Sequence, residues 1–212
     1  MSSRPEDIRH AYLLGERIYL RGATPDDAEI CAPWFNDEEV NRYLLTGRRP
    51  NTVEQSRKYL RRAMISEREV VFAIVERESG RHIGNTSLHQ IDPIFRSAVF
   101  GLVIGVRECW RRGYGTEATR LVTDYAFSRL NLHRVGLEVA ADNPNARRVY
   151  ERAGYRVEGT RREAFYVNGR YLDSVLMSIL RPEWEAARGE RVENDEKVEK
   201  GEKAEKQGEE KG

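Results

Sequence analysis

Apolar and polar positions recur along this chain with two different periods, which predict strands and helices in a mixed order. Strict alternation is typical of a half-buried strand, and apolar residues three and four positions apart are typical of one helix face. The strand-like segments are residues 17–21, 70–76, 82–91, 97–106, 134–140, 155–163, 164–167 and 170–180. The helix-like segments are residues 24–35, a short turn at 37–44, a second helix beginning at Thr52, and residues 113–130 and 144–153.

Turn and cap signals support these boundaries. Thr24 followed by Pro25 supplies an N-cap and a first-turn proline, and Gly154 lies where a helix C-cap is expected. Asn168-Gly169 lies between two strand-like runs, and this dipeptide is a strong hairpin signal. An antiparallel meander followed by helix, strand, helix and hairpin predicts an α/β protein with a mixed sheet and helices on its faces.

The length and the charge distribution predict one folded domain with a tail. The chain has 212 residues, of which 39% are hydrophobic and 33% charged, enough for one core. After Pro182 the sequence becomes rich in Glu, Lys and Gly. We therefore predict a single domain over residues 1–182 and a charged tail over residues 183–212, with disorder over residues 189–212.

Composition excludes several classes of function. The tail is net acidic, so the remainder is mildly basic although the whole chain has a net charge of +1, which suits an anionic cofactor better than nucleic acid. Cys31 and Cys109 predict no disulfide framework, and the four histidines show no metal-ligand spacing. Without an apolar signal region or a membrane-length apolar run, we expect a cytoplasmic protein that uses no metal, membrane or nucleic acid. Homo-oligomerisation stays open.

A glycine-punctuated turn is the most informative local feature. Residues 110–118 read Trp-Arg-Arg-Gly-Tyr-Gly-Thr-Glu-Ala and follow the apolar run 98–106. Two glycines let the backbone turn sharply and bring successive N–H groups toward an anion, at the positive end of the following helix. We expect a phosphorylated ligand at this turn.

Two nucleotide-binding alternatives fit this turn less well. Residues 113–118 also match the dinucleotide pattern G-x-G-x-x-G/A, and Glu138 lies near the distance expected for a ribose-binding acid. In a dinucleotide fold, however, the glycines follow the strand almost at once, whereas here residues 107–112 intervene after a meander. A nucleoside triphosphate loop would need Gly-Lys-Ser/Thr, which does not follow.

Two blocks of the chain resemble the GNAT superfamily, the Gcn5-related N-acetyltransferases. Residues 110–115 resemble its acyl-CoA loop Gln/Arg-x-x-Gly-x-Gly/Ala, with Trp110 in the first position, as in the branch that acetylates the N-termini of ribosomal proteins. Residues 143–155 resemble its signature Asn-x-x-Ala-x-x-x-Tyr-x-x-x-Gly-aromatic. The resemblance covers residues 17–180 and is clearest from Val99. It implies a mostly antiparallel twisted sheet with helices on both faces.

The resemblance also implies acetyl transfer from acetyl-CoA directly to a primary amine. Tyr150 stands at the position of a general acid that protonates the departing thiolate, and Glu138 at the position of a base, with His89 and Asp92 as alternative bases. Core packing of Tyr150, an ion pair of Glu138 and helix capping by Asn143 are the structural alternatives. The implied cofactor-binding residues are Ile104, Gly105, Val106, Arg111, Arg112, Gly113, Tyr114, Gly115, Thr116, Asn143, Ala146, Arg147 and Arg148.

The sequence leaves two candidate acceptor amines, and a third possibility is a protein without catalytic activity. The branch similarity favours a protein or peptide N-terminus, such as that of a ribosomal protein. Residues 130–133 and 168–171 resemble spermidine acetyltransferases as well, and an acidic pocket for a polyamine would come from Asp26, Asp27, Glu38 and Glu39. A non-catalytic acyl-CoA sensor that uses the charged tail for interactions is the third possibility.

Overall fold

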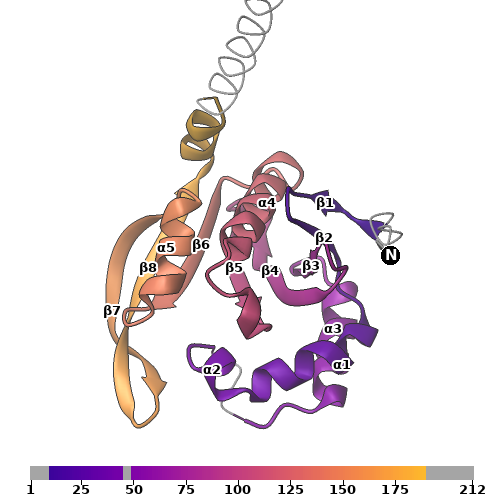
Figure 1. The fold of residues 1–212 in the computed structure, drawn as a ribbon. Helices are drawn as coiled ribbons and strands as arrows, with labels where there is room; N and C mark the ends of the chain where they lie inside the picture. Colours follow the sequence, from indigo (N-terminus) through magenta and orange to yellow (C-terminus); the bar gives the residue numbers. More distant parts are fainter. Residues whose placement is uncertain (1–9, 45–48, 190–212) are drawn as a thin grey trace, which may run out of the picture.

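The computed structural model describes residues 10–44 and 49–189, which form an eight-stranded sheet with helices on both faces (Figure 1). Predictions for residues 1–9, 45–48 and 190–212, which include most of the charged tail, fall outside the described residues. The strand order is β1-β2-β3-β4-β5-β6-β8-β7. The strands are β1 (Leu13–Leu14), β2 (Ile18–Gly22), β3 (Val70–Glu76), β4 (His82–Asp92), β5 (Ser97–Ile104), β6 (Arg134–Ala140), β7 (Arg156–Val167) and β8 (Arg170–Leu180).

Five α-helices and short 3-10 segments lie within residues 10–44 and 49–180. The helices are α1 (Ala28–Cys31), α2 (Glu38–Asn41), α3 (Val53–Met64), α4 (Tyr114–Ser128) and α5 (Pro144–Arg152). The helix predicted over residues 24–35 is broken into Pro25–Asp27, α1 and Ala32–Asn36, because Pro33 cannot donate a helical hydrogen bond. Helix α3 begins at a reciprocal capping box, in which Thr52 Oγ1 accepts from Gln55 N at 3.2 Å and Gln55 Oε1 accepts from Thr52 N at 2.8 Å.

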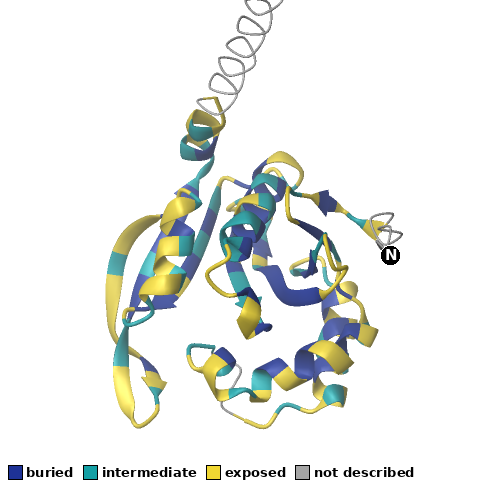
Figure 2. Cartoon of the chain, viewed as in Figure 1, coloured by how far each residue is buried: buried dark blue, intermediate teal, exposed yellow. Residues whose placement is uncertain are grey.

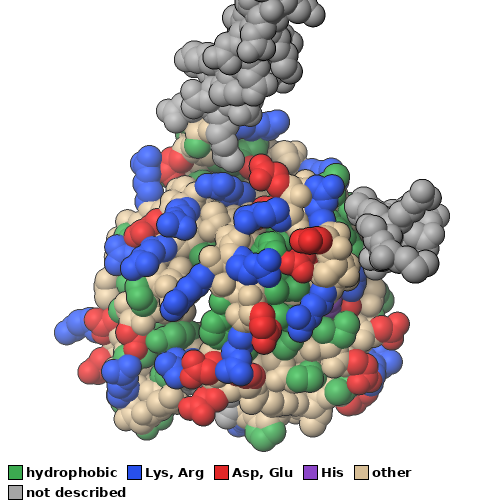
Figure 3. Space-filling model, viewed as in Figure 1, with side chains coloured by type: hydrophobic (Ala, Val, Ile, Leu, Met, Phe, Trp, Pro, Cys, Tyr) green, Lys and Arg blue, Asp and Glu red, His purple; other side chains and the backbone are tan. Residues whose placement is uncertain are grey.

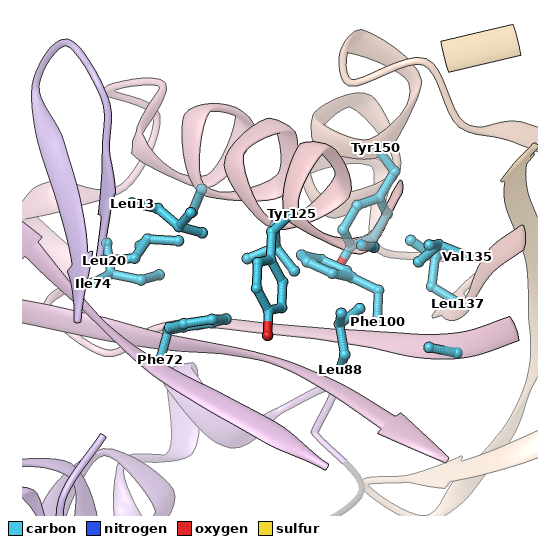
Figure 4. Close-up of a cluster of buried hydrophobic side chains, with 14 of the residues drawn as sticks. Leu13, Leu20, Phe72, Ile74, Leu88, Phe100, Tyr125, Val135, Leu137 and Tyr150 are labelled. Carbon is cyan, nitrogen blue, oxygen red and sulfur yellow. The ribbon is translucent and has the colours of Figure 1, made fainter. Parts of the chain in front are cut away.

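A large part of the hydrophobic core lies between the sheet and the pair α4 and α5 (Figures 2 and 4), and buried residues of the N-terminal helices, such as Trp34 and Leu60, belong to it as well. Leu20, Leu88, Phe100 and Leu137 reach it from the strands and Tyr125 from α4. Residues 181–189 are helical and also join this core, because Trp184 is buried, donates to Asp124 and packs on Phe127 with ring centroids 5.4 Å apart. The packed part of the chain therefore extends past the predicted boundary at residue 182.

The parallel pair β5 and β6 separates early. They pair at Ser97↔Arg134, Ala98↔Val135 and Val99↔Gly136, after which β5 continues along β4 and β6 continues along β8. The N–H of Gly105 donates to the carbonyl of Ile83 at 2.9 Å. Because backbone groups of an antiparallel strand alternate in direction, those of Leu102 and Ile104 point away from β4, into the opening beside β6.

No helix among the described residues is long and apolar enough to cross a membrane.

Gly105, just after β5, allows a close packing contact that a side chain would disrupt. A Cβ atom on Gly105 would lie 1.9 Å from Cδ2 of the buried Trp34 indole. We expect Gly105→Ala to lower the free energy of unfolding by about 1–3 kcal/mol in urea denaturation, because Trp34 must leave its packed position. Gly22→Ala is the matched control, since nothing lies within 4 Å of its Cβ position. Equal losses in the two variants would contradict this assignment.

Candidate functional site

The start of α4 lies at the wide end of the opening between β5 and β6. Gly113 is the N-cap with φ 84°, a left-handed conformation that favours glycine, and no side chain caps this helix end among the described residues. A Cβ on Gly115 would lie 3.3 Å from Leu102 Cδ2 on β5 and 3.7 Å from Val149 on α5. The unpaired N–H groups of the first turn and the positive end of the helix therefore stand beside the opening.

Arg17, just before β2, and Glu76, at the end of β3, fix this turn in place. Arg17 Nη1 donates to the carbonyl of Arg112 at 2.7 Å, and Arg17 N donates to Glu117 Oε1 at 2.9 Å. The buried Tyr114 hydroxyl donates to Glu76, which raises the pKa of Tyr114. The Tyr114 side chain thus anchors the turn, and its backbone N–H is the group left for a ligand.

The four arginines predicted to bind the cofactor differ in their partners. Arg147 Nε lies 2.8 Å from Glu151 Oε1, and Arg112 Nη1 lies 3.8 Å from Glu76 Oε1. Arg111 and Arg148 are exposed and have no side-chain hydrogen bond or ion pair within the described part of the chain. Figure 3 shows a hollow on this face beside α5, with Lys and Arg side chains around it. These two arginines are therefore available to an anion.

Tyr150 lies on the core side of the sheet (Figure 4). Its side chain is 8% exposed, and its ring centroid lies 6.1 Å from that of Phe100, the first β5 residue beyond the β6 pairing. Burial raises the pKa of Tyr150 to about 12. The hydroxyl has no hydrogen-bond partner among the residues described, so it keeps its proton at neutral pH and is free to donate it.

Glu138 lies on the opposite face. Val135, Leu137 and Val139 of β6 are buried in the core, whereas Glu138 is exposed on the other side of the strand. Its Oε1 accepts from Arg161 Nη1 at 2.6 Å and its Oε2 accepts from Ser174 Oγ at 3.0 Å. The structure thus separates Glu138 from Tyr150 by the thickness of the sheet and shows the ion pair that the sequence left as an alternative.

Asn143 and Ala146 build the start of α5. Asn143 Oδ1 accepts from Ala146 N at 3.1 Å, which is an N-cap bond, and Ala146 packs against the core. The amide nitrogen of Asn143 has no partner within residues 10–44 and 49–189. The helix-cap alternative therefore applies, and one polar atom of Asn143 remains for a ligand.

Of the two alternative bases, Asp92 caps a turn, whereas His89 takes part in a chain of side-chain hydrogen bonds. Asp92 Oδ1 caps a turn by accepting from the N–H groups of Ile94 and Phe95, both at 2.8 Å. His89 Nδ1 lies 2.7 Å from Glu69 Oε1, and its Nε2 lies 2.6 Å from Ser87 Oγ. Sequence analysis missed Glu69 and Ser87. The one signal for Ser87 was its spacing of two from His89 on a strand, which puts both on one face.

The acids expected to form a polyamine pocket are partly neutralised. Asp27 is buried and binds Arg21 through both carboxylate oxygens at 2.6 and 2.8 Å. Burial opposes the charge of Asp27, but hydrogen bonds from Arg21 and His82 hold its pKa well below the usual range. Glu39 pairs with Arg42 at 2.5 Å. Asp26 and Glu38 are exposed and have no ion pair among the described residues.

A family model and two kinds of related proteins match this chain. The family model described as "Acetyltransferase (GNAT) domain" matches residues 17–156. "Putative ribosomal N-acetyltransferase YdaF" of Bacillus subtilis is 32% identical over 181 residues, covering 82% of this chain and 97% of that protein. A spermidine N(1)-acetyltransferase of Vibrio cholerae is 38% identical over 111 residues, covering 52% of this chain and 64% of that protein.

Solved structures are similar over most of the chain. The crystal structure of spermidine N-acetyltransferase from Vibrio cholerae in complex with CoA and spermine aligns with a TM-score of 0.74 and 28% sequence identity. The alignment covers 80% of this chain and 99% of that one.

Burial of Tyr150 predicts a specific loss of stability at alkaline pH. The pKa of Tyr150 is about 12 in the folded protein and about 10 in an unfolded chain. The protonated phenol therefore contributes fully to the stability of the fold below pH 10, and this contribution is lost as the pH rises toward 12. Between pH 9 and 11, we expect the free energy of unfolding, measured by urea denaturation, to fall in both proteins. The fall should be about 1.4 kcal/mol smaller in Tyr150→Phe than in the wild type. The exposed hairpin variant Tyr166→Phe is the control. An identical alkaline loss in wild type and Tyr150→Phe would refute the raised pKa.

Proposed function

The chain belongs to the GNAT family of acetyl-CoA-dependent N-acetyltransferases, and on this premise we propose that it acetylates a protein or peptide N-terminus, such as that of a ribosomal protein. The observation that carries the proposal is the early separation of β5 and β6 beside the uncapped start of α4. One opening then joins an anion-binding helix end, a buried phenol and a polar face where an amine can enter.

The donor side is supported by backbone groups more than by side chains. The N–H groups at the start of α4, with Arg111 and Arg148, would hold the pyrophosphate. The edge of β5 at Leu102 would pair with the amides of the pantetheine arm. The carbonyl of Ile104 already accepts from the Trp110 indole at 2.8 Å, so Leu102 is the better candidate than the predicted residues 104–106.

Acetyl transfer needs a proton donor and a proton acceptor on different atoms. A bond forms between the amine nitrogen and the acetyl carbon, the bond from that carbon to sulfur breaks, and the sulfur takes up a proton. The buried Tyr150 hydroxyl, with its raised pKa and no partner among the described residues, supports the donor role. The amine would enter from the face that carries Glu138 and lose its proton there.

Charge favours a single α-amino group over a polyamine as acceptor. Asp27 and Glu39 are already neutralised by arginines, whereas a polyamine carries several charges that need several free carboxylates. Asp142, just after β6, has a buried Oδ1 without a partner in the described part of the chain, while its other oxygen lies 2.7 Å from Arg170. One free carboxylate oxygen at the end of β6 suits one ammonium group.

Spermidine is the second candidate acceptor. The similarity to the spermidine acetyltransferase bound to CoA and spermine supports it, as do the exposed Asp26 and Glu38. A CoA sensor without turnover is the remaining alternative.

The phosphate cradle can be tested by binding alone. We expect acetyl-CoA to bind the wild type in calorimetry and Gly115→Asp to bind at least about tenfold more weakly, because a carboxylate would face the pyrophosphate. The control is Gly159→Asp on β7, where nothing lies within 4 Å of the Cβ position. Equal affinities in the two variants would move the phosphates away from α4, and no binding by the wild type would overturn the donor assignment.

Turnover tests the acceptor and the acid together. With acetyl-CoA, we expect faster thiol release on peptides beginning with Ala or Ser than on spermidine. Tyr150→Phe should lower kcat about 100-fold while acetyl-CoA affinity stays within about twofold, because the hydroxyl acts when the thiolate develops. Faster turnover on spermidine would replace the N-terminal acceptor, full activity of Tyr150→Phe would remove its role, and binding without turnover on any amine would identify a sensor.

A further inference from the structure

A chain of hydrogen bonds links a hydroxyl, an imidazole and a carboxylate on the face of the sheet opposite Tyr150. Ser87 Oγ lies 2.6 Å from His89 Nε2, and His89 Nδ1 lies 2.7 Å from Glu69 Oε1. The Ser87 residue is 8% exposed, and the side chains of Glu69 and His89 are 11% and 35% exposed. The three groups come from β4 and from the segment between α3 and β3.

The donors around Glu69 fix the direction of this chain. The Tyr59 hydroxyl donates to Glu69 Oε1 at 2.7 Å, and Arg62 Nη2 donates to Oε2 at 3.3 Å. A carboxylate that receives these donors only accepts, so the proton on neutral His89 sits on Nδ1. His89 Nε2 then carries the lone pair and accepts the hydroxyl proton of Ser87, which leaves the lone pairs of Ser87 Oγ to receive another proton.

The register of β4 and β5 brings Ser87 close to the opening. Ser87 pairs with Gly101 and His89 pairs with Val99, on either side of Phe100, where β5 leaves β6. A Cβ on Gly101 would lie 2.8 Å from Ser87 Oγ, so the missing side chain leaves room for this hydroxyl. Val99 also pairs with Gly136, two residues before Glu138, so the hydrogen-bond chain shares the face of Glu138.

We propose that Glu69, His89 and Ser87 form the proton relay that deprotonates the acceptor amine, which rests on the proposed function. The ammonium gives a proton to Ser87 Oγ through water, and Ser87 passes its hydroxyl proton to His89 Nε2. The resulting imidazolium is stabilised by Glu69, and the neutral amine attacks the acetyl carbon. His89 later releases the proton to solvent.

Two rival assignments fit the geometry less well. Both oxygens of Glu138 are engaged, by Arg161 and Ser174, so proton transfer to Glu138 would break an ion pair. The order Ser87, His89, Glu69 also resembles a nucleophilic triad. Strand β5 lies between Ser87 and the opening, however, which suits transfer of a proton through water and not direct attack on the acetyl carbon.

The test compares His89→Gln, Ser87→Ala and Glu69→Gln with His133→Gln. His133 is the matched control, because it is exposed and its side chain has no bond or ion pair among the described residues. We expect His89→Gln to lower kcat/KM for the amine about 100-fold and to abolish the limb along which the rate rises with pH. Glu69→Gln should lower kcat/KM as well, since the imidazolium loses the carboxylate that stabilises it. Ser87→Ala should lower kcat/KM, and acetyl-CoA affinity should stay within about twofold in all variants.

The outcomes separate the relay from the proposed function. An unchanged pH limb in His89→Gln, with an active wild type, would overturn the relay and leave the function intact. An acetyl group on Ser87 in the mass spectrum would overturn it in favour of a nucleophile. Absence of turnover in the wild type on every amine would overturn the function. Nitrogen-15 NMR adds a readout independent of activity: Nδ1-protonated His89 supports the relay, and Nε2-protonated His89 overturns it.

Discussion

The constraint on which the site depends is the separation of two parallel strands after three paired residues. An unpaired strand edge inside a sheet is costly, because backbone groups without partners lose their hydrogen bonds. The cost is limited because β4 and β8 hold β5 and β6 on their other sides, and because the Trp110 indole satisfies the carbonyl of Ile104. The backbone groups of Leu102 are left for solvent or a ligand.

The geometry at the wide end of this opening comes from glycines that let other parts of the chain approach. Gly105 lies against Trp34 of the N-terminal helices, and Gly113 lies against the guanidinium of Arg17. These contacts join the end of β5 and the start of α4 to the rest of the fold. The Tyr114 hydroxyl and the Asn143 side-chain oxygen also form structural hydrogen bonds. The groups that remain for a ligand here are therefore mainly backbone N–H groups.

Local signals predicted the fold better than the site. The bounds of β6 and β8 match the alternation, and Asn168-Gly169 forms the predicted turn, because these patterns act within a few residues. The two-residue β1 was too short to show a period, and Trp184 lay beyond the predicted domain because its partner Asp124 is distant in sequence. The alternation of β6 could have placed Glu138 away from the core. Glu69 precedes Val70, which pairs with Leu88 across the β3–β4 hairpin, so the contact of Glu69 with His89 depends on the register of that hairpin, which the alternation alone did not define.

Placing the proposed acid and base on opposite faces solves a chemical problem that one shared pocket would not. At a single pH the acid must keep its proton while the base must lack one, and adjacent groups would exchange that proton directly. Burial keeps Tyr150 protonated, with a pKa of about 12, whereas the bond from His89 Nδ1 to Glu69 leaves the Nε2 lone pair of His89 to accept a proton. The sheet keeps the two apart, and the opening between β5 and β6 is where a reacting amine and thioester can touch both. Closing that opening would therefore separate the proton donor from the proton acceptor even if every side chain kept its place.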